Sequence, residues 1–131
     1  MIYVSQSEAY SVTFRCPKPD EIQFVPTNSG QAWNKYIAYA NVRVITQNYP
    51  PFLMSSTSTS NQVKGNYGAS FVTEDGLNDY ICNYAPIDGL DFILDSKTFP
   101  QSLQKCHFEN GEKYECFGNE DQCGLVCEVD G

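Results

Sequence analysis

Residues 69–84 read ASFVTEDGLNDYICNY, and this stretch carries the clearest indication of the fold. Side-chain character alternates with a period of two through 69–73 and again through 80–84, as expected for strands with one buried face. The tripeptide EDG at 74–76 is a turn signal between the two segments. Strands that follow one another at about ten-residue spacing, with turns between them, favour an antiparallel sheet or sandwich.

The strand pattern continues on both sides of this stretch. Further strand candidates lie at residues 10–14, 22–25, 90–94, 106–108 and 114–117. Residues 32–47 fit helical spacing in part, but they fit strand spacing better, above all over 42–46, and we interpret them as a strand. Pro100 is predicted to start one short helical turn over 100–105. The sequence therefore predicts a mainly β fold, a single antiparallel sheet or sandwich domain over residues 1–131 with little helix.

Three segments are expected to lie outside the sheet. Residues 1–9 are interpreted as a loose N-terminal lead-in, and residues 118–131 as an acidic tail that contains two cysteines. Residues 50–68 are predicted to be a flexible loop, because 55–60 contains only Ser and Thr. The apolar residues that lead into this run would form an exposed partner-binding segment. They are Phe52, Leu53 and Met54.

Chain length and net charge limit the classes of partner that the protein is expected to bind. The chain has 131 residues and a mass of 14.7 kDa, which fits one domain with one hydrophobic core. Sixteen acidic residues against eight basic ones give a net charge of −8. Nucleic acid and anionic membrane surfaces are bound through basic surfaces, so this charge argues against both. No apolar run approaches the ~18 residues of a membrane-spanning helix, and no membrane insertion is expected.

An even number of cysteines in a small acidic domain indicates a disulfide framework formed in an oxidising compartment. The six cysteines are Cys16, Cys82, Cys106, Cys116, Cys123 and Cys127. The alternative is a set of free or metal-bound thiols in a cytosolic protein. The N-terminal residues MIYVSQ lack the basic and apolar regions of a signal peptide. Given the cysteines, we expect a mature periplasmic or secreted protein whose leader has been removed.

Six cysteines allow about fifteen pairings, among which sequence alone does not choose. Asn110-Gly111 is a hairpin signal, and a hairpin there would bring two of the cysteines within bridging distance. The predicted pairs are Cys106–Cys116 across this hairpin, Cys123–Cys127 as a local bridge and Cys16–Cys82 as a long-range bridge. The long-range bridge would contribute about 4 kcal/mol in the chain-entropy description.

No catalytic set can be assembled from the sequence, so we expect a protein without enzymatic activity or cofactor. His107, the only histidine, lies beside Cys106, whose sulfur would be unavailable as a nucleophile. A zinc site could combine His107 with Cys116, Cys123 and Cys127, but this spacing is unfamiliar and contains no C-x2-C pair. The missing C-x-x-C also argues against a thioredoxin-like redox motif.

Acidic and aromatic groups offer weaker alternatives. Glu74 with Asp75, or Asp88 with Asp91, could support general acid–base hydrolysis, although acidic residues are ordinary in turns. Asp95 could join the second pair in a calcium site, but the EF-hand pattern is absent. Three tyrosines could form a ligand surface, with cross-strand packing as the simpler role. They are Tyr67, Tyr80 and Tyr84.

One constellation of residues resembles a known group of proteins. Its members are Cys16-Pro17, Ile22, Trp33, Phe71, Ile81-Cys82-x-Tyr84, Cys106 and Cys116-Phe117. The pattern spans roughly residues 16–117 and is similar to small exported domains of unknown function in intracellular bacteria such as Legionella and Coxiella, some of them named type IV secretion-associated proteins. The chain departs from the pattern because Cys116 is not followed by Pro and because Cys123 and Cys127 are additional.

The resemblance implies a cleaved leader, a periplasmic or secreted location and no known catalytic residues. It also implies disulfides at the cysteines that match the pattern, which are Cys16, Cys82, Cys106 and Cys116. Residues and resemblance together favour a non-catalytic exported bacterial protein that binds another protein, from the envelope, a secretion system or a host. The alternatives are a secreted hydrolase that cleaves envelope polysaccharide through paired carboxylates, and a virulence factor that acts on host surfaces or a small ligand. The oligomeric state stays open.

Overall fold

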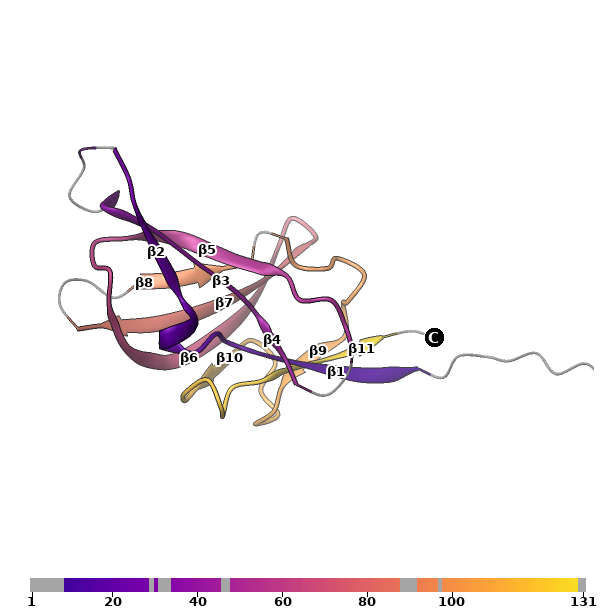
Figure 1. Cartoon of the computed structure of the whole chain (residues 1–131). Coiled ribbons are helices and arrows are strands. Elements are labelled where there is room, and N and C mark those ends of the chain that lie inside the picture. Colours follow the sequence, from indigo (N-terminus) through magenta and orange to yellow (C-terminus); the bar gives the residue numbers. More distant parts are fainter. Residues whose placement is uncertain are drawn as a thin grey trace, which may run out of the picture.

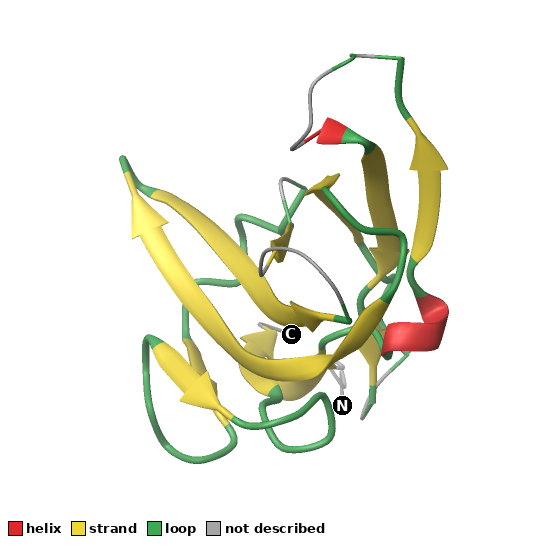
Figure 2. Ribbon diagram, turned by 90° about the vertical axis from the view of Figure 1, so that its left-hand side faces the viewer, coloured by secondary structure: helices red, strands yellow, loops and turns green. Residues whose placement is uncertain are grey.

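The computed structural model describes residues 9–28, 30, 34–45, 48–87, 92–96 and 98–129. In these residues the fold is mainly β, as predicted, and its strands form two antiparallel sheets (Figure 1). The strands are β1 (Tyr10–Arg15), β2 (Gln23–Pro26), β3 (Tyr36–Asn41), β4 (Arg43–Val44), β5 (Leu53–Ser58), β6 (Val63–Glu74), β7 (Leu77–Pro86), β8 (Phe92–Asp95), β9 (Cys106–Phe108), β10 (Glu115–Phe117) and β11 (Leu125–Val129). Figure 2 shows helix only in short segments such as η1 (Pro19–Glu21).

The small sheet has the strand order β4-β1-β11-β9. β1 pairs with β11 from Tyr10 opposite Val129 to Phe14 opposite Leu125, so the first and last strands of the chain are neighbours. β3 and β4 are separated only by the buried Val42, where the chain passes from the large sheet to the small one. The small sheet therefore joins both ends of the chain to its middle.

The large sheet has the strand order β10-β6-β7-β8-β5-β3-β2. Its longest pair is the β6–β7 hairpin predicted from the alternation and the EDG turn. Asp75 (φ 53°) and Gly76 (φ 76°) both adopt positive φ at this turn, which is the geometry of a tight two-residue hairpin connection. A β-bulge lies between Asn66 and Gly68, and bulges increase the local twist of a strand pair.

One cluster of buried side chains fills the space between the sheets. Alternate residues of each strand point into it, with Phe14 from the small sheet and Phe71 from the large sheet among them. Phe99 connects the two, because its ring centroid lies 6.3 Å from that of Phe14 and 5.3 Å from those of Phe52 and Phe71. Edge-to-face and tilted contacts of this kind add to the free energy of area burial.

All six cysteines form disulfides, as predicted. The long-range bridge Cys16–Cys82 is also the predicted one. It joins the residue that follows β1 to the middle of β7, and so ties the small sheet to the large one. The aromatic hydroxyl of Tyr80 lies 3.4 Å from the Cys16 sulfur, within the same buried layer.

The other two predicted pairs are wrong. Cys106 is bonded to Cys127, because β9 pairs with β11 and places these residues directly opposite each other with Cα atoms 4.1 Å apart. Cys116 is bonded to Cys123, because β10 leaves the hairpin and pairs with β6 in the other sheet. The Asn110-Gly111 turn does form, but the strands beyond it diverge.

The prediction of a flexible loop over 50–68 is wrong. Residues 53–58 form β5, which pairs with β3 along its whole length and touches β8, and β6 begins at Val63. Ser and Thr side chains are tolerated in a strand that has neighbours on both edges. Phe52 and Met54 are buried in the core, whereas Leu53 is 47% exposed on the outer face of the large sheet. The three residues therefore do not form one exposed segment.

The acidic C-terminal segment contains the last strand of the chain's described residues. β11 occupies the centre of the small sheet. Glu109 accepts both Arg15 guanidinium hydrogen bonds (2.8 and 2.9 Å), and Arg43 contacts the Glu120 carbonyl (2.7 Å) and Asp121 (3.3 Å). The carboxylates of Glu109 and Asp121 thus form ion pairs with Arg15 of β1 and Arg43 of β4.

Smaller expectations can be compared in the same way. The strand interpretation of 32–47 is confirmed for β3 and β4, while 31–33 and 46–47 lie outside the described residues. Pro100 starts a turn over residues 100–103, closed by the Leu103 N–H and the Pro100 carbonyl (3.1 Å), and no helix forms over 100–105. The proposed lead-in over 1–9 is described only at Ala9.

Candidate functional site

A cleft opens where the chain passes from the small sheet to the large one, between β9 and β10. The Phe108 N–H donates to the Glu112 carbonyl (2.7 Å), so at Glu112 the chain still pairs with β9. Two residues later the Tyr114 carbonyl accepts the N–H of Phe71 in β6 (2.8 Å). The chain exchanges one sheet for the other within residues 112–114, and this crossing leaves a gap between the two sheet edges.

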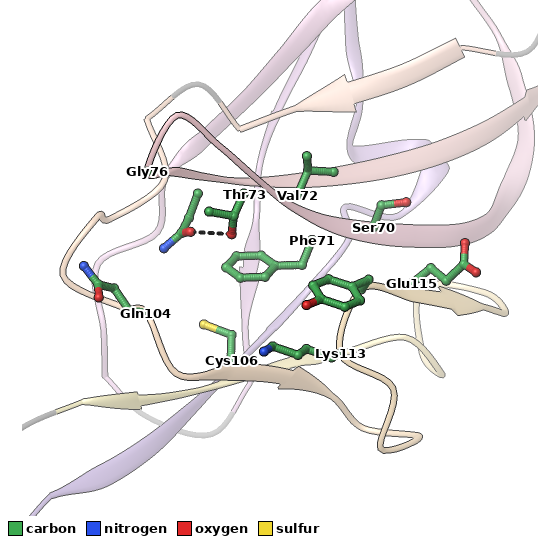
Figure 3. A pocket seen from close by; sticks show the side chains of 11 residues that line it. Ser70, Phe71, Val72, Thr73, Gly76, Gln104, Cys106, Lys113 and Glu115 are labelled. Carbon is green, nitrogen blue, oxygen red and sulfur yellow. Dashed lines mark hydrogen bonds between the residues drawn. The ribbon is translucent and has the colours of Figure 1, made fainter.

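The gap is a cleft of about 910 Å³, in the range of known ligand sites. Figure 3 looks into it, with Phe71 of β6 near the centre and Gln104 and Cys106 on the opposite side. Tyr114, which is 63% exposed, and Lys113 come from the crossing segment. The lining therefore combines aromatic surface with polar side chains.

The β6 wall of the cleft presents backbone groups that face away from the hairpin. In an antiparallel ladder, alternate residues direct their N–H and C=O groups to opposite neighbours. The Phe71 N–H points to β10, so the backbone groups of Thr73, two residues further on, point the same way. On β7, the Tyr80 carbonyl accepts the Ser96 N–H (3.1 Å), which agrees with this alternation because Tyr80 lies opposite Phe71.

The segment that leads into β10 does not pair with Thr73, because its pairing with β6 begins only at Tyr114. The register pairs Ser70 with Glu115, and its continuation would place Glu112 opposite Thr73. The Glu112 N–H instead donates to the Asn110 side-chain oxygen (3.0 Å), and its carbonyl pairs with β9. Within the described part of the chain, the Thr73 N–H and C=O thus have no strand partner on the cleft side.

The opposite wall shows the same feature on β9. The Lys105 carbonyl accepts the Glu128 N–H (3.1 Å), and the Glu109 N–H donates to the Gly124 carbonyl (2.8 Å), so these odd-numbered residues face β11. By alternation the backbone groups of Cys106 face away from β11, toward the cleft that Cys106 lines. Open edges of both sheets therefore meet at one cleft.

Backbone groups are satisfied or removed at two other positions of the large sheet. At Asn78, opposite Thr73 in the hairpin, the Gln101 side chain replaces a neighbouring strand. The Asn78 N–H donates to the Gln101 Oε1 (2.8 Å), and the Gln101 Nε2 donates to the Asn78 carbonyl (2.9 Å). In the outermost strand β2, Pro26 removes a backbone donor. Unblocked edges invite association, so such devices are expected wherever an edge has no function.

Charged groups lie at the rim of the cleft. The Lys113 ammonium is 5.4 Å from the ring centroid of Tyr114, which is a cation–π geometry. Glu74 and Glu115 are exposed near the open end of β6. The Thr73 hydroxyl donates to the Asn78 side-chain oxygen (2.8 Å), the contact dashed in Figure 3.

The three tyrosines considered as a ligand surface do not form one. Tyr80 and Tyr84 are fully buried, and only Tyr67 is exposed. The Tyr80 hydroxyl donates to the Cys123 carbonyl (3.3 Å), and the Tyr84 hydroxyl donates to the Pro17 carbonyl (2.6 Å). Burial raises the pKa of both phenols above the ordinary value. Tyr80 and Tyr84 therefore pack within the core, in agreement with a packing role and not a ligand-binding one.

The metal and catalytic alternatives gain no support from the described residues. All cysteines of the possible zinc site are held in disulfides, and His107 is exposed on β9. No group of three or more His, Cys, Asp or Glu side chains that could hold a metal occurs in the part of the chain that the structure describes. Glu74 and Asp75 are exposed at the tip of the β6–β7 hairpin, and Asp88 and Asp91 lie outside the described residues.

The sequence analysis did not find the cleft. Thr73, Cys106 and Tyr114 each belong to a different local pattern, and only the crossing of residues 112–114 between sheets brings them together. The one local clue is that the Asn110-Gly111 hairpin is followed by very few residues before the next strand.

Comparison with known proteins gives no match to a protein-family model, a curated protein or a solved structure. Among the described residues no helix has the length and apolar character needed to span a membrane.

Proposed function

We propose that this protein is a non-catalytic binding protein of an oxidising compartment, and that it binds a polypeptide segment of another protein in the cleft between its two sheets. One observation carries the proposal. Both walls of the cleft present backbone N–H and C=O groups, at Thr73 and Cys106, that no strand covers in the described residues. A polypeptide is the partner that offers matching donors and acceptors along its whole length.

Composition of the cleft supports this class of partner. Exposed aromatic side chains such as Tyr114 are enriched at protein interfaces, because a ring offers a large contact area at a low entropic cost. The net charge of −8 disfavours nucleic acid and anionic membranes in the same position.

The proposed location is the bacterial periplasm or the outside of the cell. Three disulfides, two of which join the small sheet or its adjoining loop to the large sheet, support an oxidising compartment. The resemblance to exported domains of Legionella and Coxiella adds an envelope or secretion partner, or a host protein, to this proposal. Intact mass of the native protein with and without alkylation should show a loss of about six hydrogens and no reactive thiol.

The binding proposal is tested by selecting peptides from a random display library on the immobilised wild-type protein. Selected peptides should bind Tyr114→Ser about tenfold more weakly, a loss of roughly 1.4 kcal/mol. The matched control is Leu53→Ser, which removes an exposed apolar side chain on the outer face of the large sheet. It should leave affinity within about twofold. Failure to enrich any peptide, or equal binding to both variants, would contradict the proposed function.

A further inference from the structure

We infer that the partner segment binds as an added β-strand on the open end of β6, antiparallel to it, with a basic side chain opposite Glu74. This inference rests on the proposed function and specifies the binding mode and the chemistry of the ligand. The occupant is an extended, backbone-unblocked polypeptide, and its last residue pairs with Thr73, because Lys113 and Tyr114 of this chain follow at the positions opposite Val72 and Phe71.

The place for this strand is defined by the β10 ladder. β10 pairs with β6 through Glu115, Cys116 and Phe117, and the Tyr114 carbonyl extends the pairing to Phe71. The next position in line is vacant because Glu112 is bonded within the β9 hairpin. An added strand therefore continues the line of β10 at the spacing of an ordinary ladder, about 4.8 Å from β6.

The two edges of the hairpin argue that this vacancy is a site. At the same level of the hairpin, Asn78 on β7 has both backbone groups bonded by the Gln101 side chain at 2.8 and 2.9 Å. The fold therefore supplies a side-chain substitute for a strand on one edge and leaves the other edge facing a cleft of about 910 Å³. A cleft of that size beside the edge provides the room that an added chain requires.

Alternation along β6 sets the side-chain preference. Phe71 points into the core and Val72 to the outer face, so Thr73 shares the inner side and Glu74 the outer one. A peptide residue opposite Thr73 directs its side chain into the cleft, toward Gln104. The preceding residue of the peptide lies on the outer face opposite Glu74, where a basic side chain gains a cross-strand ion pair and an acidic one is repelled.

The direct probe is a pair of synthetic peptides whose valine pairs with Thr73, acetyl-Thr-Lys-Val-amide and acetyl-Thr-Glu-Val-amide, titrated by NMR into the full chain. The basic peptide should bind about tenfold more tightly than the acidic one, and Glu74→Lys should reverse the order. The Thr73 amide should exchange with solvent about tenfold more slowly when the basic peptide is bound. A third peptide, methylated on the valine nitrogen, should lose about tenfold in affinity, because it cannot complete the ladder.

Two variants of one residue separate the backbone from the side chain. Thr73→Pro removes the N–H and the hydroxyl, whereas Thr73→Val removes only the hydroxyl. The basic peptide should bind the proline variant about tenfold more weakly and the valine variant within twofold of wild type. Equal binding to both variants, or equal binding of the methylated peptide to wild type, would overturn the inference. The methylated peptide keeps this test decisive if the proline variant does not fold.

Failure of the inference and failure of the proposed function give different results. If library-selected peptides depend on Tyr114 but ignore Thr73→Pro and backbone methylation, the cleft binds peptides by another mode and only the inference is wrong. If neither the selected nor the synthetic peptides bind the wild-type protein, both are wrong.

Discussion

The two edges of the β6–β7 hairpin differ in whether their backbone groups have hydrogen-bond partners. On the β7 side, which we call the closed edge, Asn78 is bonded by Gln101 and Tyr80 by Ser96. On the β6 side, the open edge, the ladder ends at Phe71 and the backbone of Thr73 faces a cleft. Since one hairpin carries both edges, strand propensity does not explain the difference. Long-range partners do.

The closed edge is held by contacts far apart in the sequence. Phe99 packs against three aromatic rings of the core and thereby positions the loop that carries Gln101. The Gln101 amide also donates to the Phe99 carbonyl (2.9 Å), which fixes its orientation. The open edge has no such loop among the described residues, because the segment that could have covered it crosses between the sheets.

The largest expected effect concerns the bridge that anchors the closed side. Replacing Cys16 and Cys82 together by alanine should lower the free energy of unfolding by about 4 kcal/mol, since their separation of 66 residues makes this the longest disulfide loop. Guanidinium unfolding followed by circular dichroism measures the change. The matched control is the double alanine variant of Cys116 and Cys123, whose separation of 7 predicts a loss of about 2 kcal/mol. Equal losses would show that loop length does not set the contribution.

Alkaline pH should weaken the layer behind the closed edge. Burial raises the pKa of Tyr80 and Tyr84 in the folded state, whereas the unfolded phenols ionise near the ordinary value of about 10. Their contribution is therefore complete below pH ~10 and is lost as pH rises further, by about 1.4 kcal/mol per pH unit for each tyrosine. Unfolding free energies measured from about pH 9 to about pH 11 test this, because these limits lie about one unit below and above the ordinary phenol pKa. Tyr84→Phe should remove one tyrosine's share of the slope, and an unchanged slope would contradict the assignment.

Opening the closed edge should be costly. Gln101→Ala leaves the Asn78 N–H and C=O without their side-chain partner and should lower the free energy of unfolding by about 2 kcal/mol. Amide hydrogen exchange should then show that Asn78 loses the protection that distinguishes it from Thr73 in the wild type. If Asn78 and Thr73 already exchange at similar rates in the wild-type protein, the contrast between the edges does not exist in solution.

The smallest effect is expected on the open edge itself. Thr73→Val removes only the hydroxyl contact to Asn78 and should change the free energy of unfolding by about 0.5 kcal/mol. Denaturation under the same conditions as the other variants measures it. A loss above about 2 kcal/mol would indicate that the open edge supports the fold as much as the closed one does.

Local patterns predicted most of the strands, and the cysteine count predicted that all six cysteines form disulfides, of which only the Cys16–Cys82 pair was predicted correctly. Alternation places β1, β6, β7 and β8, and the EDG turn is where the chain reverses. They failed at residues 55–58, because a run of Ser and Thr shows no alternation of apolar and polar side chains, and β5 is held by its neighbours on both sides. They failed also for Cys106 and Cys116, because a hairpin turn fixes only the residues next to it.

What the sequence by itself determined is the kind of object: a mainly β, fully disulfide-bonded acidic chain whose alternating side chains choose buried and exposed faces. Tertiary structure alone decided which strands became neighbours, and hence the Cys106–Cys127 and Cys116–Cys123 bridges and the open end of β6. The physical reason is that a side chain's alternation is encoded within a few residues. Whether a strand edge is closed depends on whether a distant part of the chain supplies a partner for it.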